Sequence, residues 1–152
     1  MKYEITNKKK RGSRYSLTLY RIRALKDFGK VKAGDLGGWI EGESNLSQEG
    51  KAWVSGDAQV SGNAKVYGDS VVSGDAWVSG NAWVCGNAEV YGDAKVYGDA
   101  RVSGDAEISE YAEVSGDAQV SGDAQVSGYA EVSGDAQVSG YAEVFGNDQI
   151  SD

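Results

Sequence analysis

Apolar and small residues recur with a period of six along most of this chain. Each unit reads small, variable, aliphatic, Ser or aromatic, Gly, and then Asp or Asn, as in Ala58-Gln59-Val60-Ser61-Gly62-Asn63. The register never changes, since Val or Ile fills every sixth position from Val54 to Ile150. A fixed short period over two thirds of a chain is typical of a solenoid.

The alternation inside each unit predicts a short β-strand followed by a corner. Val60 faces inward while Gln59 and Ser61 face outward, because side chains alternate along a strand. Gly62 and Asn63 then turn the chain, since both residue types tolerate left-handed backbone angles. A helix is excluded because a Gly in nearly every unit would destabilise it. Three such units close a triangle, which predicts coils of eighteen residues.

The hexad Val60-Ser61-Gly62-Asn63-Ala64-Lys65 follows the pattern aliphatic, small or acidic, two free positions, small, free. The chain therefore resembles the hexapeptide-repeat proteins over residues 36–152. That resemblance implies a left-handed parallel β-helix, and the hand of the coil rests on it alone. The predicted fold class is all-β, a triangular left-handed β-helix of about six coils.

The N-terminal residues lack the six-residue period and are expected to cap the first coil. Lys2–Thr6 and Tyr15–Leu25 predict two strands of a β-hairpin, with the basic run Lys8–Arg11 in its long tip. A cap is needed because the first coil of a solenoid exposes unpaired backbone and apolar core. We expect residues 1–35 to form this cap and lead-in, and residues 36–152 to form the β-helix.

The start of the coil is marked by Ile40 and Leu46, which are already six residues apart. The segment Gln48–Lys51 then adds two residues before Val54, and we expect a small bulge at a corner there. Leu19–Leu25 and Gly34–Ile40 resemble a subgroup of β-helix proteins encoded by enterobacterial phages and prophages. Some of that subgroup carry a transferase label, but the label rests on fold, and fold does not imply function.

Charge divides the chain into two unlike parts. Residues 1–43 hold eleven of the fifteen Lys and Arg against five acidic residues, whereas residues 44–152 hold four against eighteen. Opposite charges favour docking of the cap on the solenoid. The acidic part carries about one net negative charge per 2 Å of axis, close to the ~1.7 Å of duplex DNA. An acidic DNA-mimic inhibitor of a host DNA-binding protein is therefore an alternative function, and direct nucleic-acid binding is not expected.

The residues needed for known chemistry on this scaffold are missing. Hexapeptide-repeat acyltransferases use a His as base, and their carbonic-anhydrase-like relatives hold a metal with three, whereas these 152 residues contain no His. Cys85 lies at an outward slot with no adjacent base to activate it. We expect no catalysis, no cofactor and no metal. An acyltransferase-like enzyme that works without the usual His stays as an alternative.

Aromatic residues at outward positions predict an interaction surface. Exposed aromatics concentrated in one region mark contact with another molecule, with the protein's own cap or with a second copy. Trp77 and Trp83 fall in adjacent hexads and therefore on adjacent faces, which favours a homo-oligomer packed around an axis. The predicted surface comprises Trp53, Trp77, Trp83, Tyr67, Tyr91, Tyr97 and Phe145.

Three further tyrosines replace the corner Asp or Asn and are candidates for a ligand cleft: Tyr111, Tyr129 and Tyr141. Asp148 replaces the inward Ala of the last hexad, and an inward charge at an open edge limits further stacking. A closed end-to-end dimer or a blunted end is therefore expected rather than a fibre, while the resemblance to the hexapeptide-repeat proteins implies a trimer.

These observations favour a rigid, non-catalytic scaffold or binding protein that acts as a homo-oligomer. Its partner would be a host protein or a small-molecule ligand. No segment is apolar enough to span a membrane, and the single cysteine is consistent with the reducing cytoplasm of a host cell.

Overall fold

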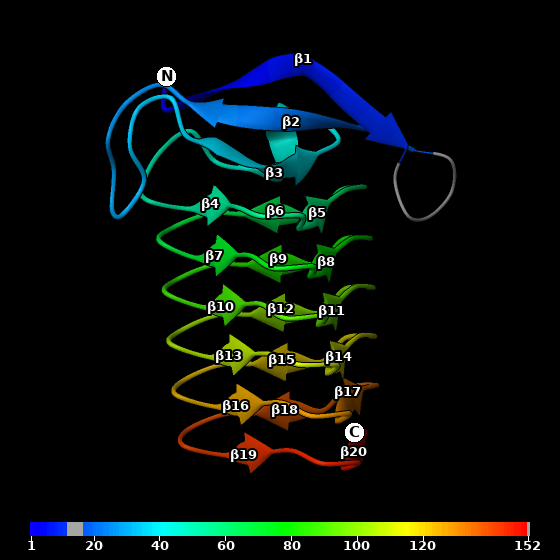
Figure 1. Ribbon diagram of the computed structural model, residues 1–152. Helices are drawn as coiled ribbons and strands as arrows, with labels where there is room; N and C mark the ends of the chain where they lie inside the picture. Colours follow the sequence, from blue (N-terminus) through cyan, green and yellow to red (C-terminus); the bar gives the residue numbers. More distant parts are fainter. Residues whose placement is uncertain (12–16, 152) are drawn as a thin grey trace.

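The computed structural model describes residues 1–11 and 17–151 and consists of a column of stacked coils beneath an antiparallel cap (Figure 1). The described residues contain one short 3₁₀ turn, η1 (Glu43–Asn45), and otherwise only β-strands and turns. The chain is thus an all-β solenoid of about six turns, as the six-residue period predicts.

The strands of the column are two or three residues long, and each coil contributes one strand to each of three sheets. Sheet 1 holds, after the cap strands, β5 (Gln59–Val60), β8 (Trp77–Val78), β11 (Lys95–Val96), β14 (Glu113–Val114), β17 (Glu131–Ser133) and β20 (Gln149–Ser151). Sheet 2 holds β4 (Trp53–Val54), β7 (Val71–Val72), β10 (Glu89–Val90), β13 (Glu107–Ile108), β16 (Gln125–Val126) and β19 (Glu143–Val144). Sheet 3 holds β6 (Lys65–Val66), β9 (Trp83–Val84), β12 (Arg101–Val102), β15 (Gln119–Val120) and β18 (Gln137–Val138).

The core is a narrow stack of Ala and Val. The aliphatic residue of each hexad and the Ala two positions before it are buried over nearly the whole column. Backbone groups bond to the coil below, as where Gln59 N donates to Ala76 O at 3.0 Å. The corners require Gly: at Gly104 φ is +65°, and an added Cβ would lie 2.7 Å from Gly122 N. Core and corner together explain why the repeat tolerates so little variation.

The first coil is two residues longer than the others. Ile40 pairs with Val60 and Leu46 with Val66, a spacing of twenty residues, whereas Val60 pairs with Val78. The expected insertion between Gln48 and Lys51 is therefore confirmed. Asn45 holds the beginning of this coil, because its side chain accepts from Glu41 N and Gly42 N and donates to the carbonyls of the next coil.

The cap is a three-stranded antiparallel sheet continuous with sheet 1. β1 (Tyr3–Arg11) pairs with β2 (Thr18–Ala24), β2 pairs with β3 (Leu36–Ile40), and β3 runs parallel to β5. The expectation that Lys8–Arg11 form the hairpin tip is wrong. These residues continue β1, with Lys10 opposite Leu19, because the strand resumes pairing after an irregularity between Ile5 and Lys9. Tyr15 lies outside the described residues.

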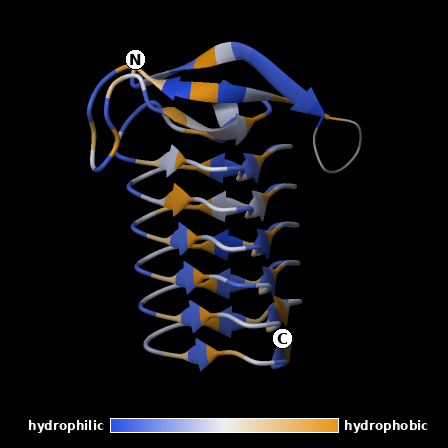
Figure 2. Ribbon diagram, viewed as in Figure 1, coloured by the Kyte–Doolittle hydropathy of each residue, from blue (hydrophilic) through white to orange (hydrophobic). Residues whose placement is uncertain are grey.

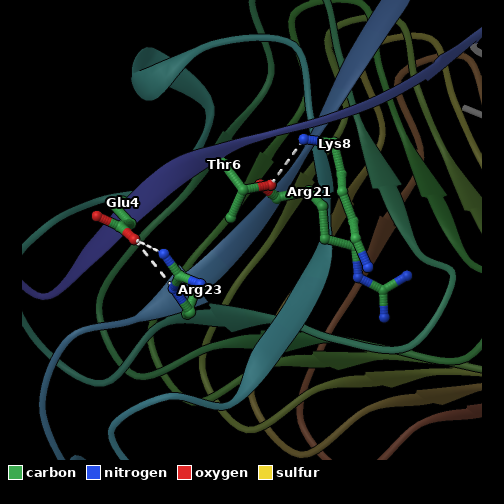
Figure 3. A network of polar contacts seen from close by, with 5 residues as sticks. All are labelled: Glu4, Thr6, Lys8, Arg21 and Arg23. Atoms are coloured by element: carbon green, nitrogen blue, oxygen red, sulfur yellow. Dashed lines mark hydrogen bonds and ion pairs between the residues drawn. The ribbon is translucent and has the colours of Figure 1, made fainter.

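Polar contacts tie β1 to β2 and tie the N-terminal end of the cap to the first coil. Arg23 pairs with Glu4, Thr6 Oγ1 donates to Arg21 O at 2.8 Å, and Lys8 N donates to Thr6 Oγ1 at 3.2 Å (Figure 3). Deeper in the cap, the buried Lys2 ammonium donates to Ala52 O at 2.7 Å and to Glu49 O at 3.2 Å. The cap is therefore docked on the two-residue bulge of the first coil.

Candidate functional site

The outward side chains of the coils form three columns, one on each sheet. Residues on neighbouring coils are in register, so Gln59, Trp77, Lys95 and Glu113 follow one another on sheet 1. Figure 2 shows a change along the column: β4 and the strands of the next coil, β7, β8 and β9, are white or orange, whereas β5, β6 and most strands farther from the cap are largely blue. The outward surface is thus most apolar beside the cap.

Trp53 is not part of an exposed surface, contrary to the sequence-based expectation. Its side chain is only 5% exposed and packs edge-on against Phe28 at 5.2 Å and Tyr3 at 6.4 Å between ring centroids. The segment between β2 and β3 folds over this end of sheet 2 and covers the indole. Trp53 is therefore a contact between cap and coil.

Trp77 and Trp83 lie on different sheets, as their hexad positions predict. Trp77 is half-buried on sheet 1 with the Lys95 ammonium 4.9 Å from its ring centroid. Trp83 is 36% exposed on sheet 3, and the Arg101 guanidinium lies 4.5 Å from its centroid. In both cases the cation comes from the next coil, so the repeat itself places a basic side chain on each ring.

Trp39 was not among the predicted surface residues, although it occupies the same column as Trp77. Lys10 lies 4.6 Å and Arg21 5.2 Å from its ring centroid. The twenty-residue first coil places Trp39 beside Gln59. A register that allowed for the expected two-residue insertion could have found it.

The tyrosines predicted beside these tryptophans are tied to neighbouring side chains. Tyr67 packs edge-on against Trp83 at 6.3 Å, and burial, with a hydrogen bond to Cys85, raises the pKa of Tyr67 to about 12. Tyr91 Oη donates to Glu107 and Tyr97 Oη to Glu113, each at 3.0 Å. These phenols are held in fixed orientations on the outside of the column.

The three tyrosines expected to mark a ligand cleft do not lie together. Tyr111 and Tyr129 occupy one corner on successive coils and stack with centroids 4.9 Å apart and planes at 5°. They are 53% and 63% exposed. Tyr141 belongs to another corner and is 85% exposed, while Phe145 is exposed on the last coil. Only the first two form a shared surface.

A groove of about 640 Å³ runs beside the Tyr111–Tyr129 stack. One wall is the corner that carries the two tyrosines, and the floor is the outward column of sheet 1. Lys10 of β1 reaches its wall. The remaining lining residues are Asp57, Asp75, Asp93, Gln59, Trp77, Lys95 and Glu113.

Three smaller observations concern metal ligands, a second hollow and membrane-spanning helices. Among residues 1–11 and 17–151, no three His, Cys, Asp or Glu side chains are grouped closely enough to hold a metal ion. A second hollow, of about 750 Å³, lies between residues 28–36 and sheet 2, and Trp53 and Val71 line it. In the described part of the chain, no helix is both long and apolar enough to cross a membrane.

The fold and its surfaces define a β-solenoid protein built from six-residue repeats, with aromatic and charged side chains on the outside of a narrow core of small aliphatic residues. The sequence model of the family described as the YdcK β-solenoid repeat matches residues 58–74. The chain is also 44% identical over 43 residues to a protein of Escherichia coli (strain K12) named "Uncharacterized acetyltransferase YdcK". That similarity covers 28% of this chain and 13% of the relative, so it spans a small part of both.

Proposed function

We propose that this chain is a rigid, non-catalytic binding protein that assembles as a homo-oligomer through the outward tryptophans of sheets 1 and 3. The observation that supports this proposal is the placement of Trp77 and Trp83 on adjacent faces, each with a cation from the next coil over its ring. Aromatic side chains of this kind are enriched at protein interfaces. A preorganised ring loses little conformational entropy on association.

Rigidity follows from the coil-to-coil ladder. Nearly every hexad donates backbone hydrogen bonds to the next coil at 2.7–3.1 Å. The outward side chains therefore stand on a fixed scaffold. Such a scaffold suits a surface that contacts another molecule without a change of shape.

The test is light scattering coupled to size exclusion for the wild type and a Trp77→Gln, Trp83→Gln double variant. Gln occupies the same outward slot at Gln59 and Gln119, so the variant keeps a residue that the repeat accepts. We expect the wild type to be oligomeric and the variant to dissociate at least tenfold more readily.

The matched control is the double variant Glu131→Ser, Gln119→Ser, which changes the same two faces in later coils. It should assemble like the wild type. A monomeric wild type, or equal dissociation of the control, would contradict the proposed assembly surface.

A second candidate is acyl transfer, which the name of the Escherichia coli relative favours. Without His, the base would be a carboxylate such as Glu113, which already accepts a hydrogen bond from Tyr97. Calorimetry with acetyl-CoA separates the candidates: heat of binding at micromolar ligand would favour the transferase, and its absence the binding protein.

A further inference from the structure

We propose that the Tyr111–Tyr129 stack and the acidic groove beside it bind an extended basic peptide through its Arg or Lys side chains. This inference rests on the proposed binding function and names the class of partner.

Three outward tryptophan rings in this chain are paired with cations. Trp39 carries Lys10 and Arg21, Trp77 carries Lys95, and Trp83 carries Arg101, all within 5.2 Å of the ring centroid. A cation over a ring face is attracted by the ring quadrupole. The outside of this solenoid therefore uses the same cation–π contact at three positions.

The Tyr111–Tyr129 stack departs from that pattern. Over the described part of the chain, no Lys or Arg lies over either ring, although both rings are more than half exposed. Because more than half of each ring is exposed, the stack offers aromatic surface to a flat or compact cation. An Arg guanidinium stacks well on such a face.

The groove supplies a net negative charge, since four carboxylates line it against the ammonium groups of Lys10 and Lys95. Asp57, Asp75 and Asp93 precede Tyr111 in the same corner column, and Glu113 lies on the adjacent strand. The backbone N–H of Asp75 and of Asp93 bonds to the next coil at 2.8 Å. The carboxylates that line the groove thus belong to a backbone that is already fixed.

The dimensions fit a peptide better than a single small cation. Five successive corner residues, from Asp57 to Tyr129, span four coil steps, or roughly 19 Å at ~4.8 Å per step. An extended chain rises about 3.3 Å per residue, so about six residues would cover this length. Residues 44–152 carry eighteen acidic against four basic residues, which favours a basic partner and speeds its approach.

The test is fluorescence anisotropy with a labelled six-residue peptide of alternating Arg and Ser, titrated with the full chain. We expect saturable binding that weakens as salt rises. The double variant Tyr111→Asn, Tyr129→Asn should bind at least tenfold more weakly. Asn fills the same slot of the same corner column at Asn147, so the variant keeps a residue that the fold accepts.

The matched control is Tyr141→Asn, the same change at another corner, which should bind like the wild type. Asp93→Asn, which removes one charge without touching the rings, should weaken binding severalfold. The proposal is overturned if the double variant binds like the wild type, if Tyr141→Asn is equally weakened, or if an alternating Glu and Ser peptide binds equally well.

Self-recognition would also overturn it. In that outcome the Tyr111→Asn, Tyr129→Asn variant loses the oligomeric state in light scattering and the wild type ignores the peptide. If the peptide fails to bind while assembly through Trp77 and Trp83 persists, this inference fails and the proposed function stands.

Discussion

Glu110 occupies the corner position that Gly fills in all the other hexads from Gly56 to Gly146. Its φ is +57°, the only positive φ of a non-glycine residue among the described positions. Left-handed geometry costs an L-residue roughly 1–2 kcal/mol because Cβ approaches the following carbonyl. The repeat therefore imposes backbone strain where its sequence departs from Gly.

We predict that Glu110→Gly stabilises the protein by roughly 0.5–1 kcal/mol, since relief of the strain exceeds the greater entropy of Gly in the unfolded chain. Urea unfolding followed by circular dichroism measures the change. Gly116→Ala is the reciprocal control and should destabilise, because φ there is +63° and the added Cβ would lie 2.9 Å from Gly134 N. An unchanged or lower midpoint for Glu110→Gly would contradict the prediction.

Among the contacts between elements, the Lys2 amine at the N-terminal end of the cap is buried against the two-residue bulge of the first coil. Burial, with a smaller contribution from Lys26, lowers the pKa of Lys2 to about 8, against an ordinary value of 10.5. Between these values the unfolded chain binds more protons than the folded one. The free energy of unfolding should therefore rise with pH across this interval. Below pH 8 it is lower, because Lys2 is then buried in its charged form.

We predict that the free energy of unfolding increases between pH 8 and 10 in the wild type and lacks this increase in Lys2→Met. The window stops at pH 10 because burial raises the pKa of Tyr3, which acts with the opposite sign above that pH. Lys65→Met, at an exposed outward slot, serves as control and should keep the wild-type slope. Equal slopes for Lys2→Met and the wild type would show that Lys2 is not the titrating group.

The strands and corners of the column were predictable because each hexad repeats the same pattern of inward, outward and turn residues. Inward Val, inward Ala and corner Gly each have a single acceptable environment, so the strands after Ala52 follow from sequence. The cap was harder. The run Lys8–Arg11 reads as a turn from its charge, yet it pairs with β2, because backbone pairing at an edge strand tolerates Lys and Arg.

Side-chain environments on the outside of the column were only partly predictable. The outward slot of Trp53 was correct, but its exposure depends on a segment more than twenty residues away in sequence that folds over it. Trp39 was missed because the bulge shifts its register by two residues. Tyr111 and Tyr129 stack because they are eighteen residues apart, which is one coil. Tyr141 is twelve residues from Tyr129 and therefore lies at another corner.

For the whole molecule, the uneven distribution of one residue type has a spectroscopic consequence. All four tryptophans lie between residues 39 and 83, so no coil from β10 onward contains an indole. Tryptophan emission therefore monitors one end of the column, whereas the far-ultraviolet signal counts strands along its full length. We predict that the two denaturation curves coincide only if the solenoid unfolds as a single cooperative unit. A gap between their midpoints would show that part of the column unfolds separately, and the far-ultraviolet signal lost in the first transition would indicate how many coils that part contains.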